Sequence, residues 1–286
     1  MLQKQTVMPG DAALLLVPRI GRALSVAVSG CTTEQTARIR DAVRGRGTVQ
    51  VVDSEREVLA RLDFNEHAWD VVIVASGTEE APTTGLVRAV VESPARAAVV
   101  VYCEPTRNMT PNIAGFAAAG AHQFLFWGVN DSAIFLREIL EAARRQCAAD
   151  RAMLLLRPII PTALHPLVEA ALSDPATVND VGRLADAVHV HRRTLFNRCA
   201  RFSCLNPTEL LAWTRLTLVA LLLEATGATV ETIAMQLGYP SPTALRNTIK
   251  RYTGLRATEI RASGGARLVL GLMQVRILER SALHLV

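Results

Sequence analysis

The chain has 286 residues, of which 50% are apolar and 20% are charged. This composition argues against a disordered chain and predicts a packed protein, and the length favours two domains. The net charge of +5 is unevenly spread, since residues 1–150 carry 15 Lys and Arg against 17 Asp and Glu, whereas residues 151–286 carry 16 against 9. The second, basic half is therefore the one suited to bind nucleic acid.

The five cysteines include no Cys-x-x-Cys pair, which argues against a disulfide framework or a metal site. We expect reduced, mostly buried thiols, with no metal and no cofactor. The apolar run at 12–17 ends without a cleavage pattern, and no run approaches the ~18–20 residues that a membrane helix needs. The sequence thus predicts a cytoplasmic protein without a signal peptide, and residues 1–22 are assigned to an N-terminal extension.

Residues 23–150 alternate between expected strands and expected helices. The strands are apolar, β-branched runs, as is typical of strands buried on both faces, at 23–28, 48–52, 70–75, 97–102 and 123–126. The helices are expected at 33–44, 54–66, 82–92, 108–119 and 131–149. Five β-α units in this length predict an α/β domain with a doubly wound, parallel five-stranded sheet of flavodoxin type, whose ligands would bind beyond the carboxyl ends of the strands.

The stretches 70–77 (DVVIVASG) and 117–128 (AAAGAHQFLFWG) resemble the receiver domain of response regulators. Working receivers carry two acids after strand one, a phosphate-accepting Asp at the end of strand three, Ser or Thr after strand four and Lys after strand five. At these places the chain has Ser29 and Gly30, Ala75 and Ser76, Tyr102 and Cys103, and Phe126 and Trp127.

Magnesium normally requires one or two carboxylate ligands, and none is offered at these places. Aspartyl phosphorylation is therefore disfavoured. We interpret residues 23–150 as a degenerate receiver-like domain used for contacts, with a small-molecule effector at the same sheet edge as the alternative.

The last helix of this domain allows two interpretations. An apolar stripe at helical spacing, consisting of Ile134, Phe135, Ile139, Leu140 and Ala143, is expected to pack on the sheet. The helix could also continue, so that the apolar run at 153–156 supplies a dimer seam. Because prolines at 158 and 161 stop any helix, the linker is placed at 151–163.

Residues 179–261 contain one pattern twice: a short helix, a tight turn and a second helix, with a long apolar helix between the copies. The pairs Leu184–Ala185 and Ile233–Ala234 lie in the first helix of each copy, where the small Ala lets the second helix cross closely. The second helices are expected at 192–202 and 242–252. The pattern predicts an all-α, seven-helix double helix-turn-helix domain over residues 164–262.

Cap residues place the helix starts in this domain. Asn179 is expected to cap the first helix of the first copy, and Asn206 with Glu209 to form a capping box on the long helix. Thr229 and Ser241 are expected to cap the two helices of the second copy. In the first recognition helix, Leu195, Cys199 and Phe202 fall at inward-facing positions, and His189 and His191 are interpreted as turn residues.

Residues 164–262 resemble the DNA-binding domain of the arabinose-regulator (AraC/XylS-type) family of bacterial transcription factors, most specifically in IAMQLGYPSPTALRNTIKRYTG. The resemblance implies two recognition helices in successive major grooves. The residues that it points to for DNA binding are Arg192, Arg193, Phe196, Asn197, Arg201, Ser241, Thr243, Arg246, Asn247, Lys250 and Arg251. Asn197 and Asn247 stand where the family usually has Arg, which leaves the target sequence undefined.

Side-chain chemistry divides these residues into base and phosphate contacts. Asn197 and Asn247 suit adenine, Arg193 and Arg246 suit guanine, and Phe196 suits a thymine methyl group. Phosphate contacts are expected from Arg201, Lys250, Arg251 and the backbone amides capped by Ser241.

The predicted function is sequence-specific, DNA-binding regulation of transcription, with double-stranded DNA as the partner. A homodimer and a contact with RNA polymerase stay open, as does the role of the tail, 263–286, which reads equally as a strand or a helix. One alternative is a protein-interaction adaptor whose helix-turn-helix pair does not bind DNA. We do not expect an enzyme, because no partnered base accompanies a nucleophile at the sheet edge. Cys31 is the one nucleophile there that is worth testing.

Overall fold

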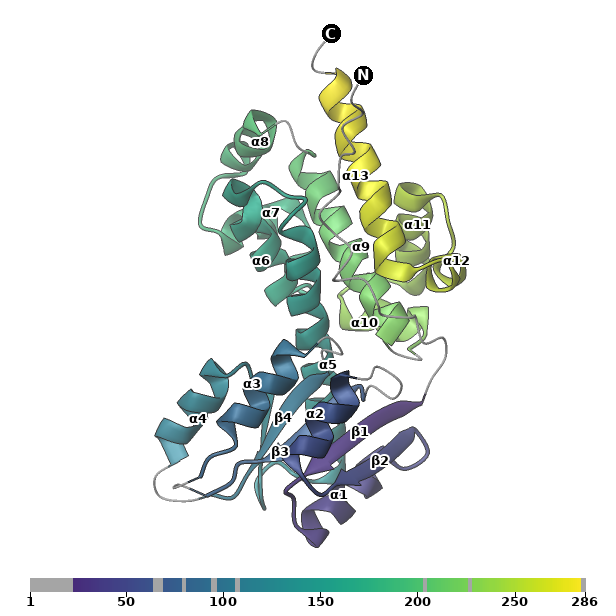
Figure 1. The fold of residues 1–286 in the computed structure, drawn as a ribbon. Coiled ribbons are helices and arrows are strands. Elements are labelled where there is room, and N and C mark those ends of the chain that lie inside the picture. The colour runs from purple at the N-terminus through teal and green to yellow at the C-terminus, as the bar shows by residue number, and fades with distance from the viewer. Residues whose placement is uncertain are drawn as a thin grey trace, which may run out of the picture.

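The computed structural model describes residues 23–63, 69–78, 81–93, 97–105, 109–202, 205–225 and 228–283. Figure 1 shows two lobes, one built around a sheet and one built of helices, with the helix α5 passing from the first into the second. The N-terminal extension 1–22 lies outside the described residues. No helix in the described part of the chain is long and apolar enough to cross a membrane.

The first lobe contains a five-stranded parallel sheet. Its strands are β1 (Leu24–Ser29), β2 (Gly47–Val52), β3 (Val71–Ala75), β4 (Ala98–Cys103) and β5 (Gln123–Phe126). Their order is β2-β1-β3-β4-β5, so β3 is the central strand, and β1 pairs in parallel with β2 on one side and β3 on the other, through Val26 with Val49 and Val71. This is the doubly wound order of flavodoxin-type folds, so the predicted fold class is confirmed.

Helices cover both faces of the sheet. They are α1 (Thr33–Val43), α2 (Glu55–Asp63), α3 (Thr84–Glu92), α4 (Met109–Ala118) and α5 (Ala133–Leu156). Because side chains alternate along a strand, Val71 and Ile73 pack toward α1 and α5, whereas Val72 and Val74 pack toward α2, α3 and α4. All five expected strands and all five expected helices are therefore present, with ends that differ by a few residues.

Helix α5 is longer than the sequence analysis expected. It continues to Leu156, six residues into the segment 151–163 that was assigned to a linker, and ends two residues before Pro158. Ala148, Ala152 and Leu156 follow one another at helical spacing and pack into the core of the second lobe, which explains the continuation. The proposed dimer seam at 153–156 is thus wrong for Met153 and Leu156, which are buried within the chain.

The stripe at the start of α5 is only partly buried. Leu140 and Ala143 pack on the sheet as expected, but Ile134 and Phe135 are 67% and 51% exposed. The prediction that these two residues face inwards was wrong, because the buried face of the helix begins at Leu136.

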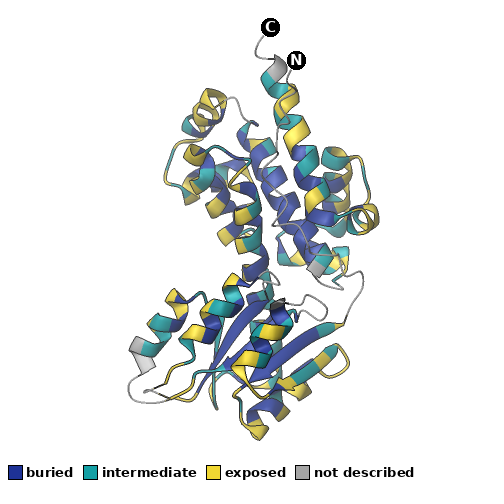
Figure 2. Cartoon of the chain, viewed as in Figure 1, coloured by how far each residue is buried: buried dark blue, intermediate teal, exposed yellow. Residues whose placement is uncertain are grey.

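The second lobe is all-helical. A short 3-10 turn, η2 (Thr162–Leu164), precedes α6 (His165–Ser173), α7 (Val181–Ala187), α8 (Arg192–Arg201), α9 (Pro207–Ala225), α10 (Val230–Gln236), α11 (Pro242–Thr253), α12 (Ala257–Ala262) and α13 (Gly265–Leu283). Between residues 164 and 262 the described chain thus forms the seven expected helices. Figure 2 shows α9 as a buried axis in the middle of this lobe.

The tail forms a helix rather than a strand. Val269 and Met273, which are fully buried and one helical turn apart, pack on α9, so a helical period fits the segment better than a period of two. Its last three residues lie outside the described part of the chain.

Candidate nucleic-acid interface

Helices α7 and α8 form the first helix-turn-helix unit. The carboxylate of Asp180, in extended backbone before α7, accepts hydrogen bonds from the N–H groups of Gly182 (2.6 Å) and Arg183 (3.0 Å). The bond from Arg183 is the main cause that lowers the pKa of Asp180. Asp180 therefore caps α7, and the prediction of Asn179 was wrong by one residue.

The turn of this unit is closed by backbone bonds. The N–H of Val190 donates to the carbonyl of Ala185 at 3.0 Å, and His189 adopts a left-handed conformation with φ of 53°. His191 then caps α8, because its Nδ1 atom accepts from the N–H of Arg193 at 3.2 Å. Both histidines are thus turn and cap residues, as predicted.

Helices α10 and α11 repeat the arrangement. The N–H of Tyr239 donates to the carbonyl of Ala234 at 2.9 Å, and Gly238 takes the left-handed conformation with φ of 67°. Thr229 caps α10 and Ser241 caps α11, through hydrogen bonds of 3.2 Å and 3.1 Å, so both predicted caps are confirmed. The two turns therefore share one backbone design.

The inner faces of the recognition helices are apolar. Leu195 and Cys199 of α8 and Leu245 and Ile249 of α11 are at most 1% exposed. Phe202 was expected to face inwards as well, but it follows the last residue of α8 and is 37% exposed. The prediction for Phe202 was therefore wrong.

The predicted DNA-binding residues lie on the outer faces of α8 and α11 or, for Ser241, at the N-cap. Ser241 is half-buried by its capping role, and the exposed ones are Arg192, Arg193, Phe196, Asn197, Arg201, Thr243, Arg246, Asn247, Lys250 and Arg251. Arg246 forms an ion pair with Glu231 of α10. Because both of these side chains are about half exposed, the pair is weak enough to exchange for a ligand.

The two units are joined through Arg215 of α9, which is 4% exposed. Its guanidinium donates to the carbonyl of Pro175 and, at 3.3 Å, to that of Val178, both in the loop before α7. It also donates to the carbonyl of Leu237 at the end of α10, at 2.7 Å. The same group lies 4.6 Å from the centre of the Tyr239 ring. One buried cation therefore ties the first unit to the turn of the second.

Comparison with known protein families decides what this arrangement is. Residues 184–263 match a family model described as "Helix-turn-helix domain". The region is a helix-turn-helix domain. This agrees with the resemblance to the arabinose-regulator family, while α6 and α13 lie outside the match. No curated protein matches the chain by sequence.

Solved structures similar to this chain include two response regulators. One is the chemotaxis response regulator CheY4 of Vibrio cholerae, with 14% identity over 42% of this chain and 98% of that chain and a TM-score of 0.35. The other is a response regulator from Burkholderia pseudomallei with a phosphorylated aspartic acid, calcium ion and citrate, with 16% identity over 60% and 96% of the two chains and a TM-score of 0.34. The fold of the first lobe is assigned from its strand order, not from these two similarities.

The carboxyl edge of the sheet holds a polar cluster that the sequence analysis did not identify. The carboxylate of Asp131 accepts from the hydroxyl of Tyr102 and from the guanidinium of Arg38, both at 2.6 Å, and from the N–H of Gly128 at 3.1 Å. Arg38 also lies 4.0 Å from the centre of the Trp127 ring. Burial alone would raise the pKa of Asp131, but these donors outweigh that effect and the pKa is lowered.

Cys31 at the same edge is poorly suited to act as a nucleophile. Burial raises the pKa of its thiol to about 12, so the thiol stays protonated at neutral pH.

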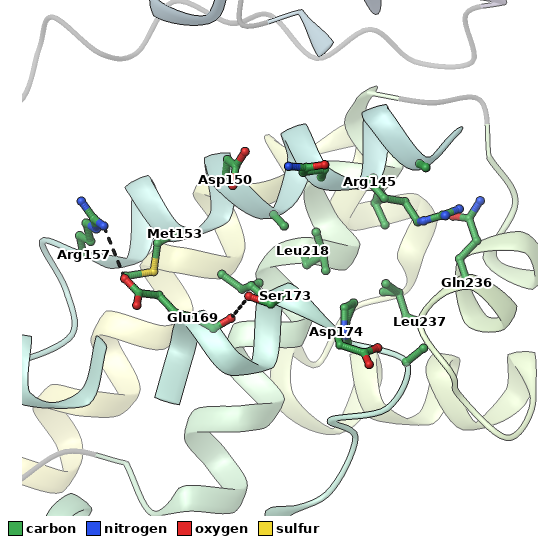
Figure 3. A pocket seen from close by; sticks show the side chains of 17 residues that line it. Arg145, Asp150, Met153, Arg157, Glu169, Ser173, Asp174, Leu218, Gln236 and Leu237 are labelled. Carbon is green, nitrogen blue, oxygen red and sulfur yellow. Dashed lines mark hydrogen bonds and ion pairs between the residues drawn. The ribbon is translucent and has the colours of Figure 1, made fainter. Parts of the chain in front are cut away.

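A cavity of about 750 Å³ lies where the two lobes meet, between α5, α6, α9 and the end of α10. Figure 3 shows Arg145 and Asp150 of α5 on one side, and Glu169, Ser173 and Leu237 from the helix-turn-helix lobe on the others. Its rim is closed in part by an ion pair between Arg157 and Glu169 at 3.5 Å. A small molecule bound here would contact both lobes, and this place differs from the sheet edge considered in the sequence analysis.

Two features of the helix-turn-helix lobe were missed from sequence. Arg215 is the only cation in the largely apolar helix α9, a signal that could have marked it as a buried hydrogen-bond donor. Arg276 and Arg280 of α13 both contact Glu209 of α9, a long-range pairing that leaves no local pattern.

Proposed function

We propose that this protein is a sequence-specific DNA-binding regulator of transcription that inserts α8 and α11 into successive major grooves. The observation that carries the proposal is the pair of helix-turn-helix units fixed on α9, each with a buried apolar face and an exposed polar face. The excess of Lys and Arg in the second half of the chain favours the same partner.

Each recognition helix supplies base contacts. Asn197 and Asn247 pair with adenine, Arg193 and Arg246 with guanine, and Phe196 with a thymine methyl group. On DNA binding, Arg246 gives up its ion pair with Glu231 and contacts guanine instead.

Backbone contacts to phosphate complete the interface. Arg192, Arg201, Thr243, Lys250 and Arg251 hold the strands, together with the amides of the first turn of α11 behind Ser241. These contacts fix the position of the domain without choosing the sequence.

The receiver-like domain acts by contact rather than by aspartyl phosphorylation. Ala75 stands where a phosphate acceptor would be, and the cluster of Asp131, Tyr102 and Arg38 occupies the same edge. Exposed Ile134 and Phe135 suit a contact with a second copy, and the continuous α5 would carry a signal from this domain to the helix-turn-helix domain. In this proposal the protein works in the cytoplasm, as a homodimer that contacts RNA polymerase.

Selection of genomic fragments by the purified full-length protein at near-physiological salt tests the DNA-binding proposal. We expect a motif with two halves about 10 base pairs apart, the separation of successive major grooves. Asn197→Ala should weaken the base preference in one half of the motif and Asn247→Ala that in the other half. Each loss should amount to about 1–3 kcal/mol of discrimination between bases. Gln274→Ala, on the exposed surface of α13, is the control and should leave both halves unchanged. Recovery of random fragments alone would contradict the proposal and favour the adaptor.

A further inference from the structure

Helix α13 is an addition to the matched helix-turn-helix region, and its first half is fixed. Val269 and Met273 are fully buried against α9, and the N–H of Ala266 donates to the carboxylate of Glu224 at 2.5 Å. The helix then continues without a break to Leu283. Its outer half therefore cannot swing away unless the helix itself breaks.

This outer half of α13 lines a groove of about 780 Å³ between the recognition helices. The opposite walls include Phe196 of α8 and Arg251 of α11, both on faces assigned to DNA. Figure 1 shows the same order in space, with α13 running along α9 and with α8 and α11 on its two sides. A duplex that receives both recognition helices would pass over this groove.

Two cations of α13 face the groove. Arg276 and Arg280 contact the carboxylate of Glu209 at 3.3 Å and 2.8 Å, and Arg276 also pairs with Glu279 at 3.1 Å. The two Arg side chains remain 42% and 32% exposed, whereas that of Glu209 is 12% exposed. Since a guanidinium has five N–H donors, pairing with Glu209 orients each Arg and leaves donors free for a second anion.

We propose that Arg276 and Arg280 bind the phosphates of the DNA segment that lies between the two major grooves. This inference rests on the proposed function. It makes α13 a third DNA-contacting element, which adds affinity without sequence preference. Contact follows from the anchoring of α13, because a fixed helix in this groove must lie against any duplex that both units bind.

The salt dependence of DNA binding tests this proposal. The double variant Arg276→Gln with Arg280→Gln is titrated with a duplex carrying the selected motif and with a random duplex, between ~50 and ~200 mM salt. Each lost phosphate contact should reduce the slope of log affinity against log salt by roughly 0.9. Affinity should fall by the same factor, on the order of tenfold, for both duplexes.

Glu209→Gln is the matched control, since it removes the ion pairs of both cations with Glu209 and keeps the two cations. It is expected to bind DNA more tightly than the wild type, because one anion leaves the groove. The charge-conserving variant Arg276→Lys with Arg280→Lys should retain most of the salt slope. These two results together would separate phosphate binding from a purely structural role of the ion pairs.

Distinct results overturn the inference and the proposed function. If the wild type selects the motif but the double Gln variant keeps its salt slope, α13 does not contact phosphate. Weakening by Glu209→Gln equal to that of the double variant, or tighter binding by the double variant, would also overturn the inference. If the wild type selects no motif, the proposed function itself fails.

Discussion

Arg215→Met is expected to lower the free energy of unfolding of the helix-turn-helix domain by about 3 kcal/mol. The substitution leaves the carbonyls of Pro175, Val178 and Leu237 without this donor, at a cost of roughly 1 kcal/mol for each. Urea unfolding followed by the fluorescence of Trp213, which lies in this domain, measures the loss. Arg267→Met, an exposed position on α13, is the control and should change stability by less than ~0.5 kcal/mol.

The same variant should also bind DNA differently. Because Arg215 connects the loop before α7 to the end of α10, its loss loosens the separation of the two recognition helices. Affinity for a site with two halves should fall toward that of a single half, while binding to one half alone stays unchanged. Wild-type stability together with wild-type affinity for the double site would show that Arg215 does not couple the units.

Gly238→Ala is expected to destabilise the second unit by about 3 kcal/mol. A Cβ at this position would lie 2.4 Å from the carbonyl oxygen of Ala176, which is backbone and cannot move aside as a side chain would. The left-handed conformation of the residue, with φ of 67°, adds to the cost.

Gly254→Ala separates these two effects. Gly254 has a similar φ of 72°, but a Cβ there would meet no heavy atom within 4 Å. It should therefore cost only about 1 kcal/mol, the contribution of the conformation itself. Equal losses for the two variants would show that the close approach of Gly238 to Ala176 adds nothing to the cost.

The sequence predicts the local structure of this chain better than its long-range contacts. The apolar β-branched runs around Val26 and Val72 identify strands buried on both faces, and the turn chemistry at Gly238 and Ser241 places α11. Such features depend on residues close together in the chain. The fold class and the two recognition helices follow from them.

The missed features depend on partners distant in sequence. Asp131 meets Arg38 across 93 residues, and Glu209 meets Arg280 across 71. Neither pair has a periodic signature, so only the fold brings the charges together. The extra turns of α5 also depend on residues distant in sequence, because Leu156 packs in the core of the second lobe.

We propose that two recognition helices at a fixed separation read two successive major grooves. The most direct test is the affinity of the full-length protein for its selected motif after insertion of half a helical turn, about 5 base pairs, between the halves. We predict that affinity falls to that of a duplex with one half destroyed, since α9 and Arg215 fix the separation of the units. Affinity equal to that of the original motif would contradict the claim.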